Sequence, residues 1–318
     1  MQDKSWPQRG QISFDNVSLR YRPNTELVLH NLTFDVAPGT KVGVVGRTGA
    51  GKSTLSLTLS RIVELEAGKI EIDGVNISEI DINQVRDKIT VIAQDPILFT
   101  GTLRFNLDPF REHSNAAIEQ LLHKAGLGDL LNREPEQSGT NQMDNLLRST
   151  EVSTSNQTLA DATSTVRERK ERKKKGMGIY FKITEAGSNL SAGERQLICI
   201  CRAILRKNRV VILDEATANI DIVTEKMIQE LIEQEFASST VITIAHRINT
   251  IIRSDKVLVL SHGEVLEYDT PKNLMEDPES EFSGLIKELK QKKKKSQNDP
   301  AALTQKKLVK RHSMLTDS

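Results

Sequence analysis

The sequence is short of cysteine and of long apolar runs, and each shortage excludes a class of protein. Only two cysteines, Cys199 and Cys201, occur in 318 residues. That is too few to cross-link a secreted chain of this length, so we expect a reducing compartment. No apolar run approaches the roughly 20 residues that cross a bilayer, and residues 1–10 lack the apolar stretch of a secretory signal. Secreted mini-proteins, collagens and integral membrane proteins are therefore excluded.

Net charge is also almost absent, because 44 Lys and Arg residues face 43 Asp and Glu residues. This balance conceals two basic segments. Residues 167–175 have a net charge of +5 and residues 287–311 have a net charge of +8, which leaves the other 284 residues at about −12. We predict an acidic folded body with two basic appendages.

The two appendages have compositions that do not favour a packed core. Residues 136–176 are rich in polar residues and then in basic ones, and residues 291–318 are rich in lysine. We predict a disordered insertion and a disordered tail, because few large apolar groups are available to offset the entropy of ordering. Contact of the basic tail with anionic lipid is an alternative. Nucleic acid is disfavoured as a partner, because neither basic run has interleaved aromatic residues for stacking.

Hydrophobic patterning predicts an α/β fold. We expect strands at residues 11–14, 17–21, 32–36, 41–45, 69–72, 89–93, 210–213, 240–245 and 256–260. We expect helices at residues 52–61, 83–88 with Asp81 as N-cap, 115–124, 192–206, 222–236 and 282–290. Strands that alternate with helices predict a mainly parallel sheet with helices packed on it.

A phosphate-binding loop is predicted between the strand 41–45 and the helix 52–61. The segment GRTGAGKST contains the pattern G-x-x-x-x-G-K-[ST] in the strand–loop–helix context that the motif requires. Lys52 is expected to contact the β- and γ-phosphates, and Ser53 is expected to bind Mg²⁺. Backbone N–H groups and the positive end of the helix would bind the remaining phosphate oxygens. The nine nucleotide-binding residues expected here are Gly46, Arg47, Thr48, Gly49, Ala50, Gly51, Lys52, Ser53 and Thr54.

A second carboxylate pair follows an apolar strand, in the segment VVILDE. Ligands of such sheets bind beyond the carboxyl ends of the strands, so Asp214 should lie beside the phosphate loop and bind Mg²⁺ through water. Glu215 is the candidate general base for an attacking water molecule. An apolar strand that ends in Asp-Glu is weak support by itself, and the phosphate loop makes the functional interpretation the favoured one.

Further motifs give the sequence a family resemblance. The segment NLSAGERQ, Asn189–Gln196, resembles the signature of ATP-binding cassette (ABC) proteins. Tyr21 resembles the aromatic residue that stacks on adenine, and Gln94 resembles the Q-loop glutamine. Residues 218–221 resemble the D-loop, and His246 resembles the switch histidine that contacts the γ-phosphate. The resemblance covers about residues 10–290 apart from the insertion.

This resemblance implies a phosphate-loop NTPase core with an antiparallel β subdomain and an α-helical signature subdomain. It implies ATP hydrolysis with Mg²⁺ in a head-to-tail dimer with a second ABC nucleotide-binding domain. The implied catalytic residues are Glu215, His246, Gln94 and Lys52. The implied Mg²⁺ ligands are Ser53, Gln94 and Asp214. Ser191 and Gly193 would contact the nucleotide held by the partner.

The residues of three segments, GRTGAGKST, Thr100–Pro109 and Trp6–Pro23, resemble the second nucleotide-binding domain of subfamily C exporters. This implies that residues 1–9 are a linker from a preceding region. It also implies transmembrane domains in the same longer chain or another subunit, and a location at the cytoplasmic face of a membrane. The signature departs from the family pattern, because Ala192 replaces a glycine and Glu194 replaces a glutamine.

Two other functions compete with transport. One is a soluble cassette ATPase acting in translation or DNA repair; such proteins generally carry paired cassettes or a long coiled-coil insertion, and neither is seen in this sequence. The other is a regulatory cassette without transport. The transported substrate is beyond the reach of the sequence, because its binding residues would lie in membrane domains.

Overall fold

The computed structural model describes residues 5–133, 177–216, 220–244 and 248–288. The chain divides into two compact units. The sheet unit consists of Met1–Gln94, Asn208–Ala218 and Phe236–Ser318, and the helical unit consists of Asp95–Lys207 and Asn219–Glu235. The predicted insertion at 136–176 and tail at 291–318 lie outside the described residues. No helix in the described part of the chain has the length and apolar character to cross a membrane.

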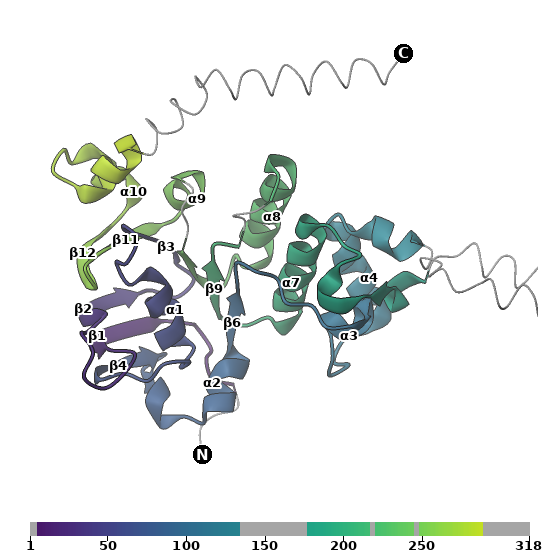
Figure 1. The fold of residues 1–318 in the computed structure, drawn as a ribbon, viewed down its shortest axis with the longest axis horizontal. Helices are drawn as coiled ribbons and strands as arrows, with labels where there is room; N and C mark the ends of the chain where they lie inside the picture. Colours follow the sequence, from purple (N-terminus) through teal and green to yellow (C-terminus); the bar gives the residue numbers. More distant parts are fainter. Residues whose placement is uncertain (1–4, 134–176, 217–219, 245–247, 289–318) are drawn as a thin grey trace, which may run out of the picture. The chain divides into compact units, whose positions relative to one another are not determined.

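The sheet unit contains a six-stranded sheet, which is parallel except for one edge strand (Figure 1). The strand order is β12 (Glu264–Asp269), β11 (Lys256–Ser261), β3 (Lys41–Val45), β10 (Thr240–Ile244), β9 (Val210–Asp214) and β6 (Ile89–Ile92). β12 is the antiparallel strand. The middle strands carry runs of buried apolar residues, as expected for strands covered on both faces. The predicted mainly parallel sheet is confirmed.

A second, antiparallel sheet belongs to the same unit. Its order is β2 (Leu29–Val36), β1 (Ile12–Leu19), β4 (Ala67–Ile72) and β5 (Val75–Asn76). The prediction of two strands at 11–14 and 17–21 is wrong, because the single strand β1 runs through most of both segments and ends at Leu19. A register shift between Phe14 and Val17 interrupts the pairing, and Asn16 there has φ 49°. Asn tolerates this left-handed conformation, so the polar residues look like a turn in the sequence although the strand continues.

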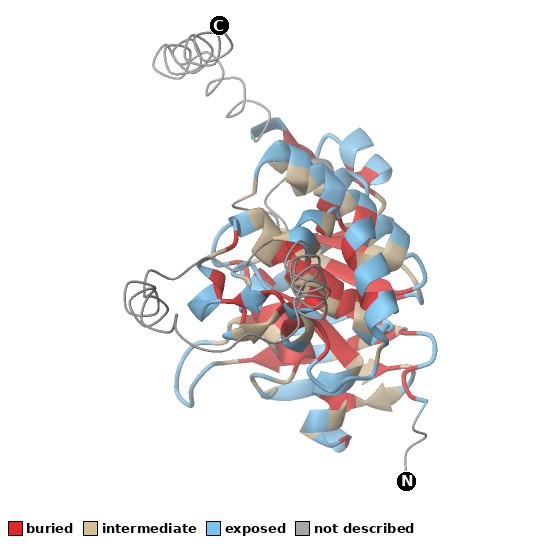
Figure 2. Ribbon diagram, turned by 90° about the vertical axis from the view of Figure 1, so that its right-hand side faces the viewer, coloured by how far each residue is buried: buried red, intermediate tan, exposed pale blue. Residues whose placement is uncertain are grey.

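One apolar cluster joins both sheets to α1 (Lys52–Leu59). Phe14 and Phe34 stack with ring centroids 4.4 Å apart, and Leu55 and Leu59 of α1 are almost completely buried in the cluster. Figure 2 shows that buried residues concentrate in the strands. The helix that follows the phosphate loop is therefore packed into the core, which fixes the position of its first turn.

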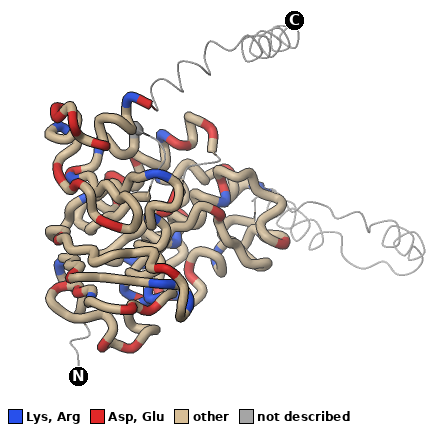
Figure 3. The backbone as a smooth tube through the Cα atoms, turned by 60° about the vertical axis from the view of Figure 1, so that its left-hand side comes forward, with Lys and Arg blue, Asp and Glu red and all other residues tan. Residues whose placement is uncertain are grey.

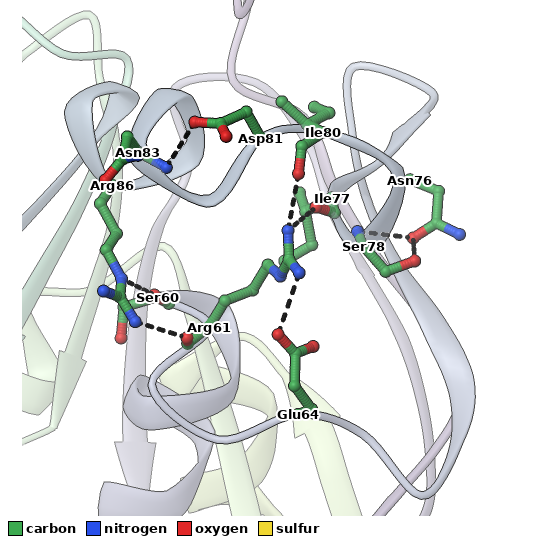
Figure 4. Close-up of polar contacts among 10 residues, drawn as sticks. All are labelled: Ser60, Arg61, Glu64, Asn76, Ile77, Ser78, Ile80, Asp81, Asn83 and Arg86. Carbon is green, nitrogen blue, oxygen red and sulfur yellow. Dashed lines mark hydrogen bonds and ion pairs between the residues drawn. The ribbon is translucent and has the colours of Figure 1, made fainter.

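Polar contacts tie the far end of α1 to η1 (Ile77–Glu79) and α2 (Ile82–Lys88) (Figure 4). The Arg61 guanidinium donates to the carbonyl oxygens of Ile77 at 2.9 Å and Ile80 at 2.7 Å. Arg86 on α2 donates to the carbonyl oxygen of Arg61 at 2.9 Å. Asp81 accepts hydrogen bonds from the first N–H groups of α2, which confirms the predicted N-cap.

The rest of the sheet unit contains α9 (Ile248–Ile252), α10 (Pro271–Glu276) and a helical stretch at residues 281–288, which we call the C-terminal helix. Phe282 and Ile286 of the C-terminal helix are buried in a cluster with apolar residues of α9, β11 and α10. Val45, the last residue of β3, packs against the same cluster. The C-terminal helix is thus anchored next to the strand that leads into the phosphate loop.

The helical unit is built around α7 (Ala192–Arg206) and α8 (Ile222–Glu235). It also contains the helices α3 (Leu103–Leu107), α4 (Asn115–Lys124), η2 (Gly128–Asn132), η3 (Gly178–Tyr180) and η4 (Glu185–Gly187), and the paired strands β7 (Gly101–Thr102) and β8 (Lys182–Ile183). The predicted helices 115–124 and 192–206 are confirmed. Arg202 on α7 donates to the carbonyl oxygen of Asn106 at 2.7 Å. Burial raises the pKa of Cys201 on α7 to about 12, so this thiol is a packing residue.

Candidate functional site

Topology places the predicted catalytic residues of the sheet unit at one edge of the parallel sheet. Gly46 follows β3, Asp214 ends β9 and Gln94 follows β6 by two residues, all at carboxyl ends of parallel strands. β10 lies between β3 and β9 and ends at Ile244. His246, two residues further on, lies outside the described residues. Ligands of open parallel sheets bind at this edge, so the arrangement agrees with a nucleotide site.

The phosphate loop needs glycine at Gly46 and Gly51 for steric reasons. Gly46 has φ 152°, and a Cβ atom there would lie 2.3 Å from the carbonyl oxygen of Leu260. Gly51 has φ 96° and is the N-cap of α1, where a Cβ atom would lie 2.7 Å from Leu29. Residues with a side chain rarely adopt these conformations and would collide with their neighbours. The predicted glycines therefore shape a loop that runs directly into a helix N-terminus.

Lys52 folds back across this loop. Its side chain is buried, and its Nζ donates to the carbonyl oxygens of Gly46 at 2.8 Å and Arg47 at 2.9 Å. Burial lowers the pKa of Lys52, and the nearby carboxylates of Glu215 and Asp214 oppose that effect. A partly desolvated ammonium group is thus held between the loop and two carboxylates. Such a group can exchange its carbonyl partners for phosphate oxygens.

The carboxylate pair lies where β9 leaves the sheet. Asp214 and Glu215 are both half-buried. Glu215 has φ 47°, and its N–H donates to the carbonyl oxygen of Ile244 at the end of β10 at 2.9 Å. Positive φ is uncommon for a residue with a side chain, and such conformations cluster at functional sites. The hydrogen bond stabilises this unusual backbone conformation. It thereby also fixes the point at which the Glu215 side chain leaves the main chain.

Tyr21 lies beside the phosphate loop, as an adenine-stacking residue should. Its side chain is half exposed, and its hydroxyl forms a 2.8 Å hydrogen bond with Oγ1 of Thr54, in which either oxygen is the donor. Thr54 is buried, whereas Thr48, Gly49 and Ser53 are exposed. The ring is therefore connected to the loop and remains open to a ligand.

The donor set at this edge suits Mg²⁺. The Ser53 hydroxyl, the Asp214 carboxylate and the exposed Gln94 side chain supply oxygen ligands, and oxygen is what Mg²⁺ prefers. The described residues contain no group of three or more His, Cys, Asp or Glu that could hold a metal. Mg²⁺ usually keeps several water ligands and shares phosphate oxygens with a substrate, so it does not require such a group.

Arg47 makes a contact that sequence reasoning missed. Its guanidinium lies 3.3 Å from Oε1 of Glu281 and 4.0 Å from Oε1 of Glu288, both on the C-terminal helix. More than 230 residues separate Arg47 from these partners, and no local pattern in the sequence indicates the pairing. The Arg47 side chain, predicted to contact nucleotide, thus points to the C-terminal helix.

The predicted signature forms the N-terminus of α7 in the helical unit. The Ser191 hydroxyl accepts from the N–H of Glu194 at 3.2 Å, and the Glu194 carboxylate accepts from the N–H of Ser191 at 2.8 Å. This capping box satisfies two donors at the helix start. The other oxygen of Glu194 pairs with Arg133. Ser191 is exposed, and a hydroxyl that accepts the Glu194 N–H can also donate its own proton, so this side chain is able to bind a phosphate.

A cavity of about 350 Å³ lies beside the signature within the helical unit. It is lined by Gly126, Leu127, Asp129, Leu130, Arg133, Ser191, Ala192, Gly193, Glu194, Leu197, Ile220, Asp221, Thr224 and Met227. Gly193 faces Thr224, because a Cβ atom on the glycine would lie 2.9 Å from Cγ2 of the threonine. The predicted signature glycine therefore permits close packing of α7 against α8. Asp221, from the predicted D-loop, accepts hydrogen bonds from the N–H groups of Val223 and Thr224.

The sequence of this chain is similar to a protein family and to proteins of known description. A family model described as ABC transporter matches residues 29–218. Multidrug resistance protein mrp-7 of Caenorhabditis elegans is 43% identical over 281 residues, which are 88% of this chain and 16% of that protein. ATP-binding cassette sub-family C member 3 of Mus musculus is 44% identical over 272 residues, which are 86% of this chain and 15% of that protein.

A solved structure agrees with these sequence relatives. It is titled "Structure of a bacterial Atm1-family ABC exporter with ATP bound", has 28% sequence identity and superposes with a TM-score of 0.70. The match covers 89% of this chain and 42% of that chain. The chain spans 15 to 17% of the length of its curated relatives.

Proposed function

This chain belongs to the ABC transporter family, and we propose that it is the ATP-hydrolysing nucleotide-binding domain of a subfamily C exporter, corresponding to the second such domain. The family, the phosphate-loop NTPase fold and the resemblance to subfamily C predicted from the sequence are confirmed. A soluble cassette acting in translation or DNA repair is not favoured, because relatives that match most of this chain include proteins named as transporters.

The single observation that carries the proposal is the buried Lys52 ammonium, held inside the phosphate loop next to Asp214 and Glu215. ATP is proposed to stack its adenine on Tyr21 and to place its phosphates in the loop 46–54, where Lys52 exchanges its carbonyl partners for β- and γ-phosphate oxygens. Ser53, Gln94 and Asp214 would hold Mg²⁺, which would neutralise phosphate charge. Phosphoryl transfer depends mainly on this positioning and on electrostatic stabilisation.

We assign the activation of the attacking water molecule to Glu215. As general base, the Glu215 carboxylate accepts a proton from the water while the water oxygen bonds to the γ-phosphorus and the bond to ADP breaks. The hydrogen bond from the Glu215 N–H to Ile244 positions this carboxylate at the end of β9. His246 is proposed to stabilise the charge that develops on the γ-phosphate.

A second cassette is proposed to complete the site. Ser191 and Gly193 at the start of α7 would contact the nucleotide held by that partner, because helix N-termini favour phosphate groups. Glu194 brings a negative charge to this helix start, which opposes a second anion. Its ion pair with Arg133 offsets that charge, so the acidic signature is compatible with a bound polyphosphate.

The proposed domain occupies residues 10–290, interrupted by the insertion at 136–176 and followed by the Lys-rich tail at 291–318, for which contact with anionic lipid is an alternative role. Residues 1–9 are the proposed linker from a preceding region. Trp6 donates to the carbonyl oxygen of Ile72 at 2.8 Å, and Asp73 accepts from the N–H groups of residues 8–11, so the linker is fastened to β4. Transmembrane domains would receive the motion of the cassette dimer at the cytoplasmic face of a membrane.

The substitution Glu215→Gln tests the proposed reaction. We expect MgATP binding to be retained and phosphate release to fall by about 10²- to 10⁴-fold, because the amide cannot act as a base. Glu264→Gln, which removes an exposed carboxylate on β12, is the matched control and should leave both unchanged. Turnover that is unaffected in Glu215→Gln would refute the assignment of the base, and loss of binding would show that Glu215 has a structural role instead.

A further inference from the structure

The C-terminal helix contacts the phosphate loop on both sides of its first glycine. Before Gly46, Val45 packs against the cluster that contains Phe282 and Ile286 of the C-terminal helix. After Gly46, the Arg47 guanidinium pairs with Glu281 and Glu288 of the same helix. The apolar contact fixes the helix next to the loop, and the ion pairs turn the Arg47 side chain toward the helix.

The position of Glu281 is itself fixed by hydrogen bonds. The N–H groups of Glu281 and Phe282 donate to the Glu267 carboxylate on β12 at 2.8 and 3.2 Å. The Ser280 hydroxyl donates to the same carboxylate at 2.9 Å. The first turn of the C-terminal helix is thus attached to the sheet, so Glu281 is held in place next to the phosphate loop.

We infer that the C-terminal helix is a brake on nucleotide binding, because Glu281 and Glu288 withhold the Arg47 guanidinium from the polyphosphate. This inference rests on the proposed function of the loop. Arg47 is exposed and has a long side chain, so the guanidinium has two competing sets of anions, the two carboxylates and the phosphates of ATP.

Removing the negative charges of Glu281 and Glu288 tests whether the C-terminal helix limits nucleotide binding. In the 318-residue chain, Glu281→Gln/Glu288→Gln should tighten MgATP binding about two- to five-fold in calorimetric titrations, the size expected for exposed ion pairs. Affinity for AMP, which lacks the β- and γ-phosphates, should not change. Glu276→Gln/Glu279→Gln is the matched control, because it removes two exposed carboxylates of the same segment, one of which pairs with Lys272.

A double-mutant cycle separates the brake from general electrostatics. In an Arg47→Gln background the gain from Glu281→Gln/Glu288→Gln should disappear. The inference is overturned if the gain persists in that background, if the control pair produces the same gain, or if there is no gain at all. A wild-type chain that does not bind ATP would refute the proposed function instead.

Hydrogen exchange tests the ion pairs without nucleotide. Arg47→Gln should increase the exchange rates of amides at 284–288 by about two- to five-fold, because the helix loses its tie to the loop. Arg22→Gln, at an exposed position in the same unit, is the control and should leave these rates unchanged. Unchanged exchange in Arg47→Gln would overturn the brake independently of any ATP measurement.

Discussion

Replacing Asp73 by Asn should loosen the linker and destabilise the sheet unit. Asp73 Oδ2 accepts from the N–H groups of Gln8, Arg9 and Gly10 at 2.8, 2.8 and 3.2 Å, and Oδ1 accepts from Gln11 at 2.8 Å. Asn loses the negative charge and turns an NH₂ group toward at least one of these donors. Hydrogen bonds to charged groups each contribute about 1.5–3 kcal/mol. Because the site is partly exposed and the bonds are not additive, we expect a loss of about 2 kcal/mol.

The pH dependence of this loss has a definite sign. Burial acts to raise the pKa of Asp73, but the backbone hydrogen bonds from residues 8–11 outweigh it, so the pKa is lowered. The stabilisation is therefore complete above the unfolded-state pKa of about 3.9 and is lost as the pH falls through the folded-state value. The difference in unfolding free energy between wild type and Asp73→Asn should therefore be constant above about pH 4 and shrink as the pH falls below it.

The chain contains its own probe for this experiment. Trp6 is the only tryptophan in the sequence, is buried, and donates to the residue just before Asp73. Urea unfolding followed by tryptophan fluorescence therefore reports on the fastened linker. Asn tolerates the φ of 50° at this position, so the substitution isolates the hydrogen bonds from backbone strain. Asp87→Asn, at an exposed position, is the control, and equal stability of Asp73→Asn and wild type at pH 7 would refute the reasoning.

Two further substitutions address the loop and the signature. Gly46→Ala should abolish measurable ATP binding, because its Cβ would lie 2.3 Å from the carbonyl oxygen of Leu260. Gly49→Ala, whose Cβ would meet no atom within 4 Å beyond its chain neighbours, carries only the strain of φ 83° and should keep part of the affinity. Equal losses in a nucleotide titration would contradict this. Arg133→Gln should increase hydrogen exchange in the first turn of α7 by about two- to five-fold, since it breaks the ion pair with Glu194. In a Glu194→Gln background, Arg133→Gln should have no further effect, and a persisting effect would refute the pairing.

The sequence predicted the elements whose signals are local. The phosphate loop combines glycines, a preceding apolar strand and a following helix, and the structure places β3 at Lys41–Val45 and α1 at Lys52–Leu59. Asp81 was predictable as an N-cap because an acidic side chain just before a helix satisfies its free N–H groups. The predicted helix 192–206 coincides with α7, whose start is fixed by the capping box of Ser191 and Glu194.

Other features depend on contacts between distant segments. β12 was not predicted, although Glu264–Asp269 alternates partly between apolar and polar residues, because its pairing with β11 across a tight turn decides its conformation. α3 is five residues long, too short for a periodic pattern. The ion pairs of Arg47 require the C-terminal helix to pack beside β3, which no local pattern indicates. Figure 3 shows that charges of both signs are interspersed along the described chain, so charge pattern alone does not select these partners.

A calorimetric MgATP titration of the 318-residue chain and of Lys52→Ala tests the nucleotide site at the loop 46–54 most directly. We expect saturable binding by wild type and a loss of at least about tenfold in affinity for the variant, since a charge-assisted contact to phosphate is removed. Lys88→Ala, at the end of α2 in the same unit, should bind as wild type does. Equal affinity of Lys52→Ala and wild type would contradict the assignment of the loop 46–54 as the nucleotide site.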